Sequence, residues 1–348
     1  MLNLSGYRNE FTTMQPNPEI SHAIQTAIDS WQKIRLGCDP VADLQQVVEK
    51  MRKMATGAPR NQCMNTFVRT LGEPGTLATW LDILRHTYHQ NNTAGQKICQ
   101  ILQSYKRHSH YGHCQLLMLV SERHLTEAIT PTSARVSANQ TKHAQQWDMT
   151  LSIWQPLATG TSFASAKRSE PHLLVEPAHT HPFDFVSKVV IGTMYQSTYR
   201  STTKEVSSGS KGRYAGVSLT RVDRTWPPHQ YRKQAWLETL EDRVPLQAGD
   251  SYFLPSDLIH DVEMDLTISF NQPTITLMLS AESTVSADVY LEPVMLDFHD
   301  ANPNLKDADC EMPFETWNEI LRDTSAYLRG ASTLQLPRMS IKDSFLVH

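Results

Sequence analysis

The first hundred residues repeat apolar positions every three or four residues, which is the period of an α-helix. Four such stripes follow one another along the chain: Ile20, Ile24, Ala27, Ile28 and Trp31; Val41, Leu44, Val47, Val48, Met51 and Met54; Leu77, Trp80, Leu81, Leu84 and Tyr88; and Ala94, Ile98, Ile101, Leu102 and Tyr105. Asp39 and Pro40 precede the second stripe as a helix-capping residue and a first-turn proline. The pattern predicts a helical bundle or a helical cap.

Near residue 150 the pattern changes to short runs of β-branched and aromatic residues, separated by Gly, Pro, Asn and Asp. These runs are Leu173–Val175, Phe183–Ile191, Gly216–Val222, Ser251–Leu254, Thr267–Phe270 and Thr274–Leu279. Short strands at such close spacing predict a β-sandwich or barrel. A last helical stripe, which ends at Gly330, consists of Trp317, Ile320, Leu321, Thr324 and Leu328. We therefore expect an α+β protein with a helical region over 1–150, a barrel over 151–300, and a C-terminal helix and tail over 301–348.

The composition is that of an ordinary globular protein, and it narrows the choice of partners. Among 348 residues, 36 acidic residues against 32 Lys and Arg give a net charge of −4, which offers nothing for nucleic acid to bind. No apolar run approaches the roughly 20 residues that cross a bilayer. The five cysteines form no C-x-x-C pair and the first ten residues have no apolar core, so we expect a reduced, cytoplasmic protein without a secretory signal.

Histidine is the residue type whose number, 15, is unusual. His179 and His181 stand one residue apart in a segment that has the pattern of a strand. Side chains alternate along a strand, so both imidazoles point to one side and can ligate one metal ion at about 2 Å each. A third histidine, His260, follows a short strand that is bracketed by turn signals, and we expect it at the start of the next strand.

These segments resemble the two sequence motifs of the cupin superfamily. The first motif is H-x-H followed by a strand that ends in glycine, which is Gly192 here. The second motif, G-x5-P-x4-H, matches at Gly249, Pro255 and His260, with Asp257 where a glycine is common. The resemblance covers roughly residues 165–285. It implies a double-stranded β-helix, the cupin barrel, over the middle region of the chain.

The resemblance also implies a ligand set, with His179, His181 and His260 as three facial metal ligands. Many cupins add a glutamate four or five positions after the second histidine, where this chain has Phe185 and Val186. The site is therefore similar to that of the three-histidine cupins, such as the thiol dioxygenases. Their pattern after H-x-H includes a Phe, a Lys and a Gly, as do Phe185, Lys188 and Gly192. Their His/Tyr pair has no counterpart in Thr274–Ser280, so thiol oxidation by that machinery is not expected.

Asp184, Lys188 and Tyr195 are the candidate catalytic residues. Strict alternation turns Asp184 away from the histidines, but a bulge at Pro182 would rotate it toward the metal as a carboxylate ligand. Asp184 can instead accept a hydrogen bond from a ligating histidine and set its tautomer, or lie at the surface. Tyr195 is one of three candidate bases, the others being Tyr199 and Glu263, for Lewis-acid chemistry at the metal.

Two other segments invite a functional interpretation. His108, His110, His113 and Cys114 are good ligand types for a second metal ion, although the segment has no clear period and resembles an exposed connector. Arg200–Arg213 is rich in Ser and Gly and carries four cations, so it predicts either a mobile lid over an anionic substrate or a solvated hairpin tip.

The function that the resemblance implies is that of a mononuclear non-haem iron enzyme, an oxygenase or dioxygenase acting on a small polar molecule. Three neutral histidines leave three positions of an octahedral ferrous ion for an anionic substrate and dioxygen. Two alternatives stay open: a lyase or isomerase that uses zinc or nickel, with manganese also suitable for the site, and a ligand-binding module without catalysis. A homodimer is compatible with either, and neither nucleic acid nor a membrane is an expected partner.

Overall fold

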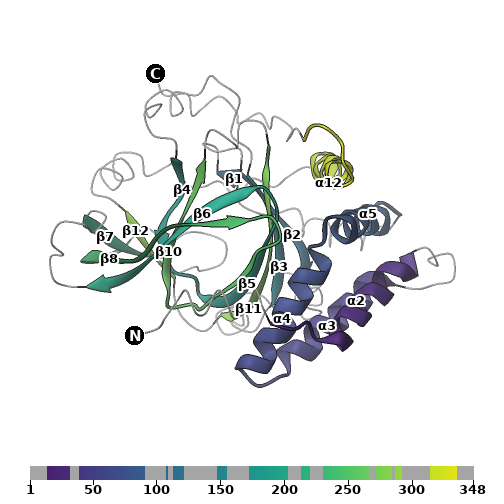
Figure 1. The fold of residues 1–348 in the computed structure, drawn as a ribbon, viewed down its shortest axis with the longest axis horizontal. Coiled ribbons are helices and arrows are strands. Elements are labelled where there is room, and N and C mark those ends of the chain that lie inside the picture. The colour runs from purple at the N-terminus through teal and green to yellow at the C-terminus, as the bar shows by residue number, and fades with distance from the viewer. Residues whose placement is uncertain are drawn as a thin grey trace, which may run out of the picture.

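The structure, a computed structural model, describes residues 14–31, 39–90, 107–108, 113–120, 147–154, 172–202, 213–219, 230–265, 272–283, 287–291 and 314–334. Helices lie at both ends of the chain and strands lie between them (Figure 1). The described helices are α2 (Pro18–Ser30), α3 (Pro40–Arg52), α4 (Ala58–Leu71), α5 (Pro74–Gln90) and α12 (Phe314–Leu328).

Capping residues and apolar stripes place α2, α3, α5 and α12 where the sequence predicts them, whereas no predicted stripe corresponds to α4. Asn17 caps α2 and Asp39 caps α3, each by accepting hydrogen bonds from two backbone N–H groups of the first turn. The α12 stripe is buried, and the chain leaves α12 through Gly330, whose φ of 103° is in the left-handed region. Three of the four N-terminal stripes are confirmed as α2, α3 and α5. The fourth, Ala94–Tyr105, lies outside the described residues.

The strands form two antiparallel sheets. The first, which we call the helix-backed sheet, has the order β1 (Arg107–His108), β2 (His113–Val120), β3 (Asp148–Trp154), β11 (Thr274–Ser283), β5 (Phe183–Ile191) and β9 (Ser251–Leu254). The second, which we call the histidine sheet, has the order β10 (Ile259–Asp265), β4 (His172–His179), β12 (Ala287–Leu291), β7 (Arg213–Leu219), β8 (Gln230–Gln247) and β6 (Thr193–Thr202). The prediction of an α+β protein is confirmed.

The strand pairings of the histidine sheet run in a ring, because β6 pairs with β8 and also with β10. The link between β4 and β12 in this ring is a single residue pair, His179 with Val289. In the described part of the chain, no strand pairing joins this sheet to the helix-backed sheet. The expected double-stranded β-helix, a barrel made by two facing sheets, therefore stays a prediction.

The helices cover one face of the helix-backed sheet (Figure 1). Helix α4 packs on β5, β9 and β11, and α5 packs on α12. One hydrophobic core contains side chains from all three regions expected from the sequence, among them Leu44, Phe67, Leu151, Leu277 and Trp317.

The strands begin earlier than expected, since β1 and β2 lie within the range 1–150 for which the sequence predicted a helical region. Cys114, Leu116, Met118 and Leu119 of β2 are buried in the core shared with the helices. In the sequence, a strand that is buried under helices has the pattern of a short continuous apolar run. Periodicity alone cannot distinguish such a run from a segment of a buried helix.

The two faces of β5 contribute side chains to two different hydrophobic cores. Val186 and Val190 face the helices and belong to the helix-side core. Phe185 and Val189 face the other way, into a second core that contains Tyr252 and residues of the histidine sheet. The turn after β5 requires Gly192, whose φ is 85° and at which a Cβ atom would lie 2.5 Å from Oγ1 of Thr274.

Candidate metal centre

Three histidines from two distant segments of the chain meet where β4 ends and β10 begins. His179 ends β4, and His260 lies directly opposite it near the start of β10. His181 stands in the turn between β4 and β5. Its Nε2 lies 3.1 Å from Nε2 of His179 and 3.0 Å from Nε2 of His260. The ligand atoms of the three residues all lie within 4.8 Å of one another, so together they can hold a metal ion.

Hydrogen bonds on the far side of two rings set their orientation. Nδ1 of His179 lies 2.8 Å from the carbonyl oxygen of Pro177. A carbonyl oxygen only accepts, so the bond requires Nδ1 to carry the proton, and Nε2 of neutral His179 then has a free lone pair. Nδ1 of His260 lies 2.7 Å from the side-chain amide of Gln196, which is completely buried. The same arrangement follows for His260 when the amide presents its oxygen.

The separations of the nitrogen atoms fit one coordination geometry better than another. With metal–nitrogen bonds of about 2.1 Å, two ligands at right angles lie about 3.0 Å apart, and two at the tetrahedral angle lie about 3.4 Å apart. The separations of 3.0 and 3.1 Å on either side of His181 fit the right angle. Right angles at His181 are those of an octahedral ion, such as a ferrous, manganous or nickel ion.

Aromatic side chains from β5 pack around His181. The Phe183 ring stacks on it at a centroid distance of 5.4 Å, and the Phe185 ring meets it edge-on at 4.7 Å. Phe185 also contacts Tyr252 of β9 edge-on at 6.2 Å. These rings hold His181 in one orientation. They also keep polar side chains, which could compete for a metal ion, away from one side of the cluster.

The structure does not bring Asp184 to the histidines. Its Oδ1 accepts a hydrogen bond of 2.8 Å from the backbone N–H of Ser256, in the turn after β9. The carboxylate therefore joins two turns, and it is not part of the group of residues that can share a metal ion. The bulge expected at Pro182 does not rotate Asp184 inward, because Phe183 and Phe185 occupy that side of β5.

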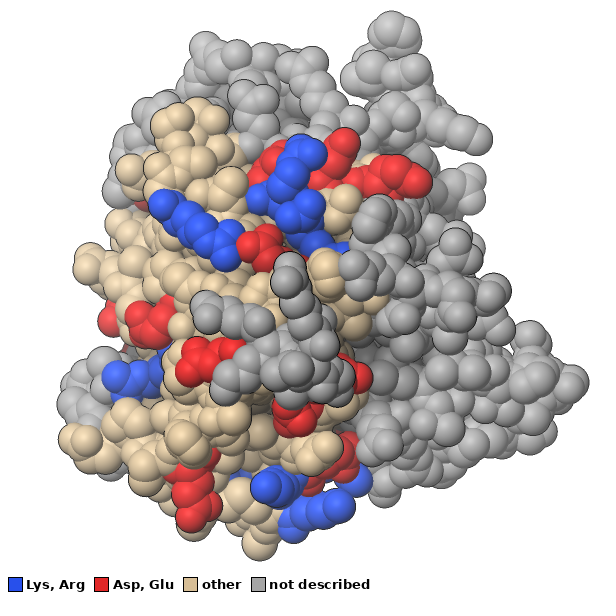
Figure 2. All heavy atoms as spheres, turned by 90° about the vertical axis from the view of Figure 1, so that its right-hand side faces the viewer, with Lys and Arg blue, Asp and Glu red and all other residues tan. Residues whose placement is uncertain are grey.

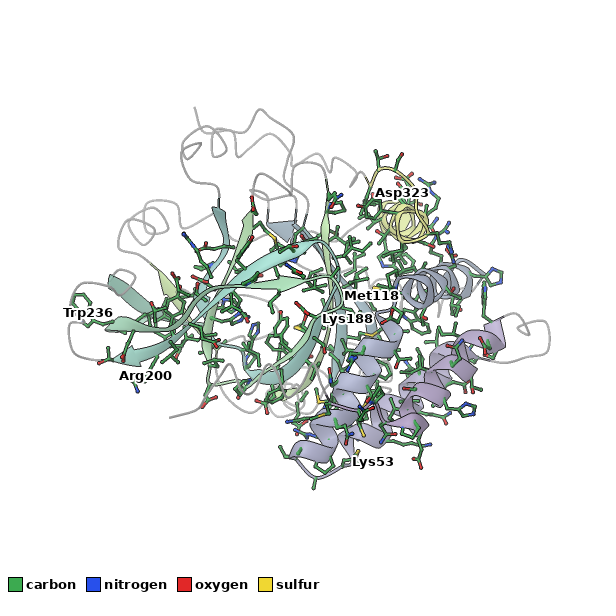
Figure 3. The ribbon with its side chains drawn as sticks, viewed as in Figure 1. Lys53, Met118, Lys188, Arg200, Trp236 and Asp323 are labelled. Carbon is green, nitrogen blue, oxygen red and sulfur yellow. The ribbon has the colours of Figure 1, made fainter. Side chains whose placement is uncertain are left out.

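Lys188 lies on the opposite face of β5 from Phe185 and is 3% exposed. Its Nζ donates to Oε1 of Glu73 at 2.5 Å and to the carbonyl oxygen of Arg69 at 3.1 Å. Figure 3 shows Lys188 where the sheet meets the helices. Burial lowers the pKa of Lys188, although the ion pair with Glu73 opposes that effect. In this structure Lys188 connects the end of α4 to β5 and does not face the histidines.

The three tyrosine and glutamate candidates lie on the other face of the histidine sheet. Gln196 and Thr198 of β6 share the face of His260, so the alternating positions Tyr195, Ser197 and Tyr199 point away from it. Tyr199 is buried and its hydroxyl donates to Asp261, while Oε2 of Glu263 accepts from Nε of Arg243 at 2.8 Å. None of these three candidates is brought to the histidine cluster.

Two residues near the cluster were not anticipated. Gln196 is one of them, through its contact with His260. The other is Glu176, whose Oε2 lies 3.7 Å from Nε2 of His179. Alternation along a strand places residue 176 opposite to residue 179, so the sequence pattern carries no signal for it.

Two expectations lie wholly or partly outside the described residues. Residues 203–212 of the expected lid are not described, but Arg200 forms an exposed ion pair of 2.5 Å with Glu238. Figure 3 shows Arg200 and Trp236 at the end of the molecule away from the helices. His110 of the possible second metal site is also outside the described residues, while β1 and β2 contain His108, His113 and Cys114. Within the described ranges, His179, His181 and His260 form the one group suited to a metal ion.

Two surface features bear on possible partners. On the helix-covered side, the described acidic and basic side chains lie intermixed, without a continuous patch of one sign (Figure 2). Of the helices that the structure describes, none has the length and apolar character needed to cross a membrane.

The comparisons with known proteins leave the family open. No protein-family model matches the chain, and no curated protein sequence matches it. The structure is similar to a crystal structure of DMSP lyases, at 14% identity over 39% of this chain and 39% of that chain with a TM-score of 0.19. It is also similar to hydroquinone 1,2-dioxygenase from Sphingomonas sp. TTNP3 with 4-hydroxybenzoate bound, at 13% identity over 40% of this chain and 61% of that chain with a TM-score of 0.21.

A third similar structure is L-ribose isomerase from Acinetobacter sp. DL28 in complex with L-ribose. The identity is 17% over 40% of this chain and 49% of that chain, with a TM-score of 0.19. The chain thus spans less than two thirds of each of these three proteins. Similarities of this size assign neither a fold family nor an activity, so the inferences below depend on the geometry of the histidines.

Proposed function

We propose that this protein is a mononuclear metal enzyme whose ion is held by His179, His181 and His260. The observation that carries the proposal is the convergence of three Nε2 atoms, with separations of 3.1 and 3.0 Å from the central one. The hydrogen bond from Nδ1 of His179 to the Pro177 carbonyl supports it, because a proton on Nδ1 leaves the Nε2 lone pair free for a metal ion.

We further propose that the ion is ferrous and that the reaction is an oxygenation of a small polar molecule. Ferrous ion prefers octahedral coordination, and the right-angle spacing of the nitrogens supports that geometry over the tetrahedral one. When bound, such an ion supplies a redox couple and open coordination positions for a substrate and dioxygen. A lyase or isomerase that uses zinc or nickel is the competing function.

The residues around the ion have separate tasks in this proposal. The Pro177 carbonyl fixes the tautomer of His179, and Gln196 holds the ring of His260 in its orientation. Phe183 and Phe185 limit the approach of water from the β5 side, where they pack against His181. Asp184, which accepts from the backbone of Ser256, and Lys188, which pairs with Glu73, have no direct task at the ion in this proposal, and neither does Tyr195.

The test is a metal-binding measurement on the purified chain, loaded separately with ferrous, manganous, nickel and zinc ions. We expect one ion per chain for the wild type and well under one for His181→Ala. His22→Ala, which removes an exposed histidine of α2, is the matched control and should bind like the wild type. Stoichiometric binding by a variant that lacks all three site histidines would disprove the site.

The reaction class is tested separately, by oxygen uptake with a panel of small polar compounds. Substrate-dependent oxygen consumption by the iron-loaded protein supports the oxygenase. Turnover without oxygen by the zinc or nickel form would favour the lyase or isomerase. A wild-type protein that retains no metal would instead favour a ligand-binding module.

A further inference from the structure

His181 differs from the other two histidines of the candidate metal centre in how the fold holds it. His179 and His260 lie on β4 and β10 and face each other as a strand pair. His181 lies in the connector 180–182, which belongs to neither β4 nor β5. Its Nε2 nevertheless makes both of the short separations within the cluster. The geometry of the site therefore depends on what fixes this connector.

Thr180 binds the first end of the connector to β12. Its N–H donates to the carbonyl oxygen of Asp288 at 2.8 Å, and its Oγ1 accepts from the N–H of Asp288 at 2.9 Å. Asp288 comes directly before Val289, which pairs with His179. The threonine side chain thus takes a backbone N–H that a neighbouring strand would otherwise satisfy, and the two bonds continue the attachment to β12 past the end of β4.

Asp184 binds the other end of the connector to the turn before β10. Its Oδ1 accepts from the N–H of Ser256 at 2.8 Å. A further hydrogen bond of 3.1 Å, from the N–H of Leu258 to the carbonyl oxygen of Pro255, closes this turn, so Ser256 has a fixed place in the segment that leads to His260. The side chain of Asp184 therefore joins the two segments of the chain that contain the histidines.

Local chemistry restricts the connector between these two attachments. The ring of Pro182 fixes its own φ near −65° and excludes the helical region for the preceding residue, which is His181. Phe183 and Phe185 pack on the imidazole. Ordering a ligand at the moment of binding weakens the affinity, so a connector that is already fixed strengthens it.

We propose that Thr180 and Asp184 are positioning residues that fix His181 and thereby raise the metal affinity of the site. Their hydrogen bonds with Asp288 and Ser256 are called the connector brace below. The inference rests on the proposed metal site and adds to it what holds the third ligand. Neither residue belongs to the group that can share an ion, and Asp184 acts as a hydrogen-bond acceptor and not through its charge.

The first test titrates metal-free Asp184→Ala and Asp184→Asn with cobalt(II), whose visible absorption reports coordination. Asp184→Ala removes the acceptor and should weaken cobalt binding by about 10-fold or more, because residues that orient metal ligands contribute about 10–100-fold. Asp184→Asn keeps an oxygen acceptor without the charge and should recover most of the affinity. The matched control is Asp257→Ala, which removes an exposed carboxylate from the same turn as Ser256 and should bind like the wild type.

The second test applies the same titration to Thr180. Thr180→Val removes the hydroxyl that accepts from Asp288 while it keeps the shape of the side chain and the N–H that donates. We expect weaker cobalt binding by Thr180→Val and nearly full affinity for Thr180→Ser, which keeps the hydroxyl. This pair carries the test if Asp184→Ala does not fold, as judged by urea unfolding of each variant.

Hydrogen exchange of the metal-free protein reports on the connector without any ion. The N–H groups of Ser256 and Asp288 are donors in the connector brace. Exchange should therefore become faster at Ser256 in Asp184→Ala and at Asp288 in Thr180→Val. Unchanged exchange at both positions would show that the hydrogen bonds do not fix the connector, and would overturn the proposal.

The metal titrations separate the proposal from a role in folding and from the metal site itself. Wild-type cobalt affinity in folded Asp184→Ala and Thr180→Val would overturn the proposal and leave the three-histidine site standing, even if both variants are less stable. Equal losses in Asp184→Asn and Asp184→Ala would also overturn it, because the charge of Asp184 would then be what counts. If the wild type binds no cobalt, the metal site fails, and the role of the connector brace in metal binding fails with it.

Discussion

The helix-side core and the histidine sheet bury different kinds of side chain. The core between the helices and the helix-backed sheet is built from apolar side chains, among them Leu151, Leu277 and Trp317, and the helices also bury small polar side chains such as Asn65, Thr66, Thr324 and Ser325. Its buried charges, Arg60 and Lys188, are each paired with a glutamate. The histidine sheet instead buries a run of polar residues along β6 and β10, namely Gln196, Ser197, Thr198, His260, Asp261 and Glu263.

The two sides of the molecule bury side chains with different energetic consequences. Burying apolar surface stabilises a fold, whereas a buried polar group destabilises it unless it is hydrogen-bonded. Much of the polar run is hydrogen-bonded: Asp261 accepts from the Tyr199 hydroxyl and from the backbone N–H of Ser197. Three of the buried groups of the histidine sheet, His260, Asp261 and Glu263, are ionisable, and they lie on the strand that contains one residue of the candidate metal centre.

The largest effect on stability is expected from the scaffold. Leu277→Ala removes a completely buried side chain of β11 and should lower the free energy of unfolding by about 3 kcal/mol. Metal affinity at 25 °C should not change, because Leu277 faces the helices. Urea unfolding and metal titration measure the two quantities. His181→Ala should instead lose metal affinity while its free energy of unfolding changes little. If folded Leu277→Ala lost metal, the helix-side core and the histidine sheet would not have the separate roles expected here.

A smaller effect is expected at the ion pair between α4 and β11. Nη1 of Arg60 donates to Oε1 of Glu282 at 2.6 Å, and the Trp147 indole donates to Oε2 at 2.6 Å. Burial raises the pKa of the Glu282 carboxyl, but these hydrogen bonds outweigh it and the pKa is lowered overall. Glu282→Gln should therefore lower the free energy of unfolding by about 2 kcal/mol at neutral pH.

The pH dependence of the same variant has a definite sign. A carboxyl whose pKa is lowered on folding stabilises the protein above the pKa of the unfolded chain, 4.5, and the contribution disappears as pH falls through the lower pKa of the folded state. The difference between wild type and Glu282→Gln should thus be constant above about pH 5.5 and shrink below pH 4.5. A difference that grows in acid would contradict the assignment.

Two buried threonines give a sharper comparison of the two sheets. Thr198 of β6 is completely buried beside His260, and its hydroxyl has no hydrogen-bond partner among the described residues. The Thr274 hydroxyl of β11 donates to the carbonyl oxygen of Thr193 at 3.1 Å. We expect Thr198→Val to stabilise the metal-free protein by about 1 kcal/mol and Thr274→Val to destabilise it by about 1 kcal/mol. Thermal unfolding measures both, and equal effects would show that the hydroxyl environments do not differ.

The smallest effect is expected at Lys188. Its removal leaves Glu73 with a side chain that is 64% exposed and therefore hydrated, so no charge is left buried without a partner. Lys188→Met should change the free energy of unfolding by less than about 1 kcal/mol. Metal affinity and turnover should equal those of the wild type. A loss of turnover in a stable, metal-loaded variant would restore Lys188 as a catalytic residue.

Local sequence patterns alone predicted the bounds of several strands. The runs Phe183–Ile191 and Ser251–Leu254 have the bounds of β5 and β9. Their ends carry strong local signals, because Gly192 and Gly249 adopt positive φ angles of 85° and 97°. The expected position of His260 at the start of a strand is confirmed for the same reason, since the preceding turn signals are local.

Lys188 and Asp184 show where local patterns were insufficient. Both occupy positions that a linear motif can mark, yet the faces of β5 are distinguished by what packs on them. The helices cover one face, where Lys188 meets Glu73, and the aromatic rings around His181 cover the other. The two-residue alternation of a strand predicts which side chains share a face of β5, but it does not predict which face lies toward the histidines.

The sequence by itself placed a third histidine at the start of a later strand, because the turn signals before it are local. It also predicted that His179 and His181 share a side of one strand, whereas the structure ends β4 at His179 and places His181 in the turn that follows. Tertiary structure alone decided that His260 lies opposite His179 and that Glu176 contacts His179. Both facts depend on how β4 pairs with β10, where the register shifts between His179 and Glu176. Register is set by packing between segments about 80 residues apart in the chain, so no local pattern encodes it.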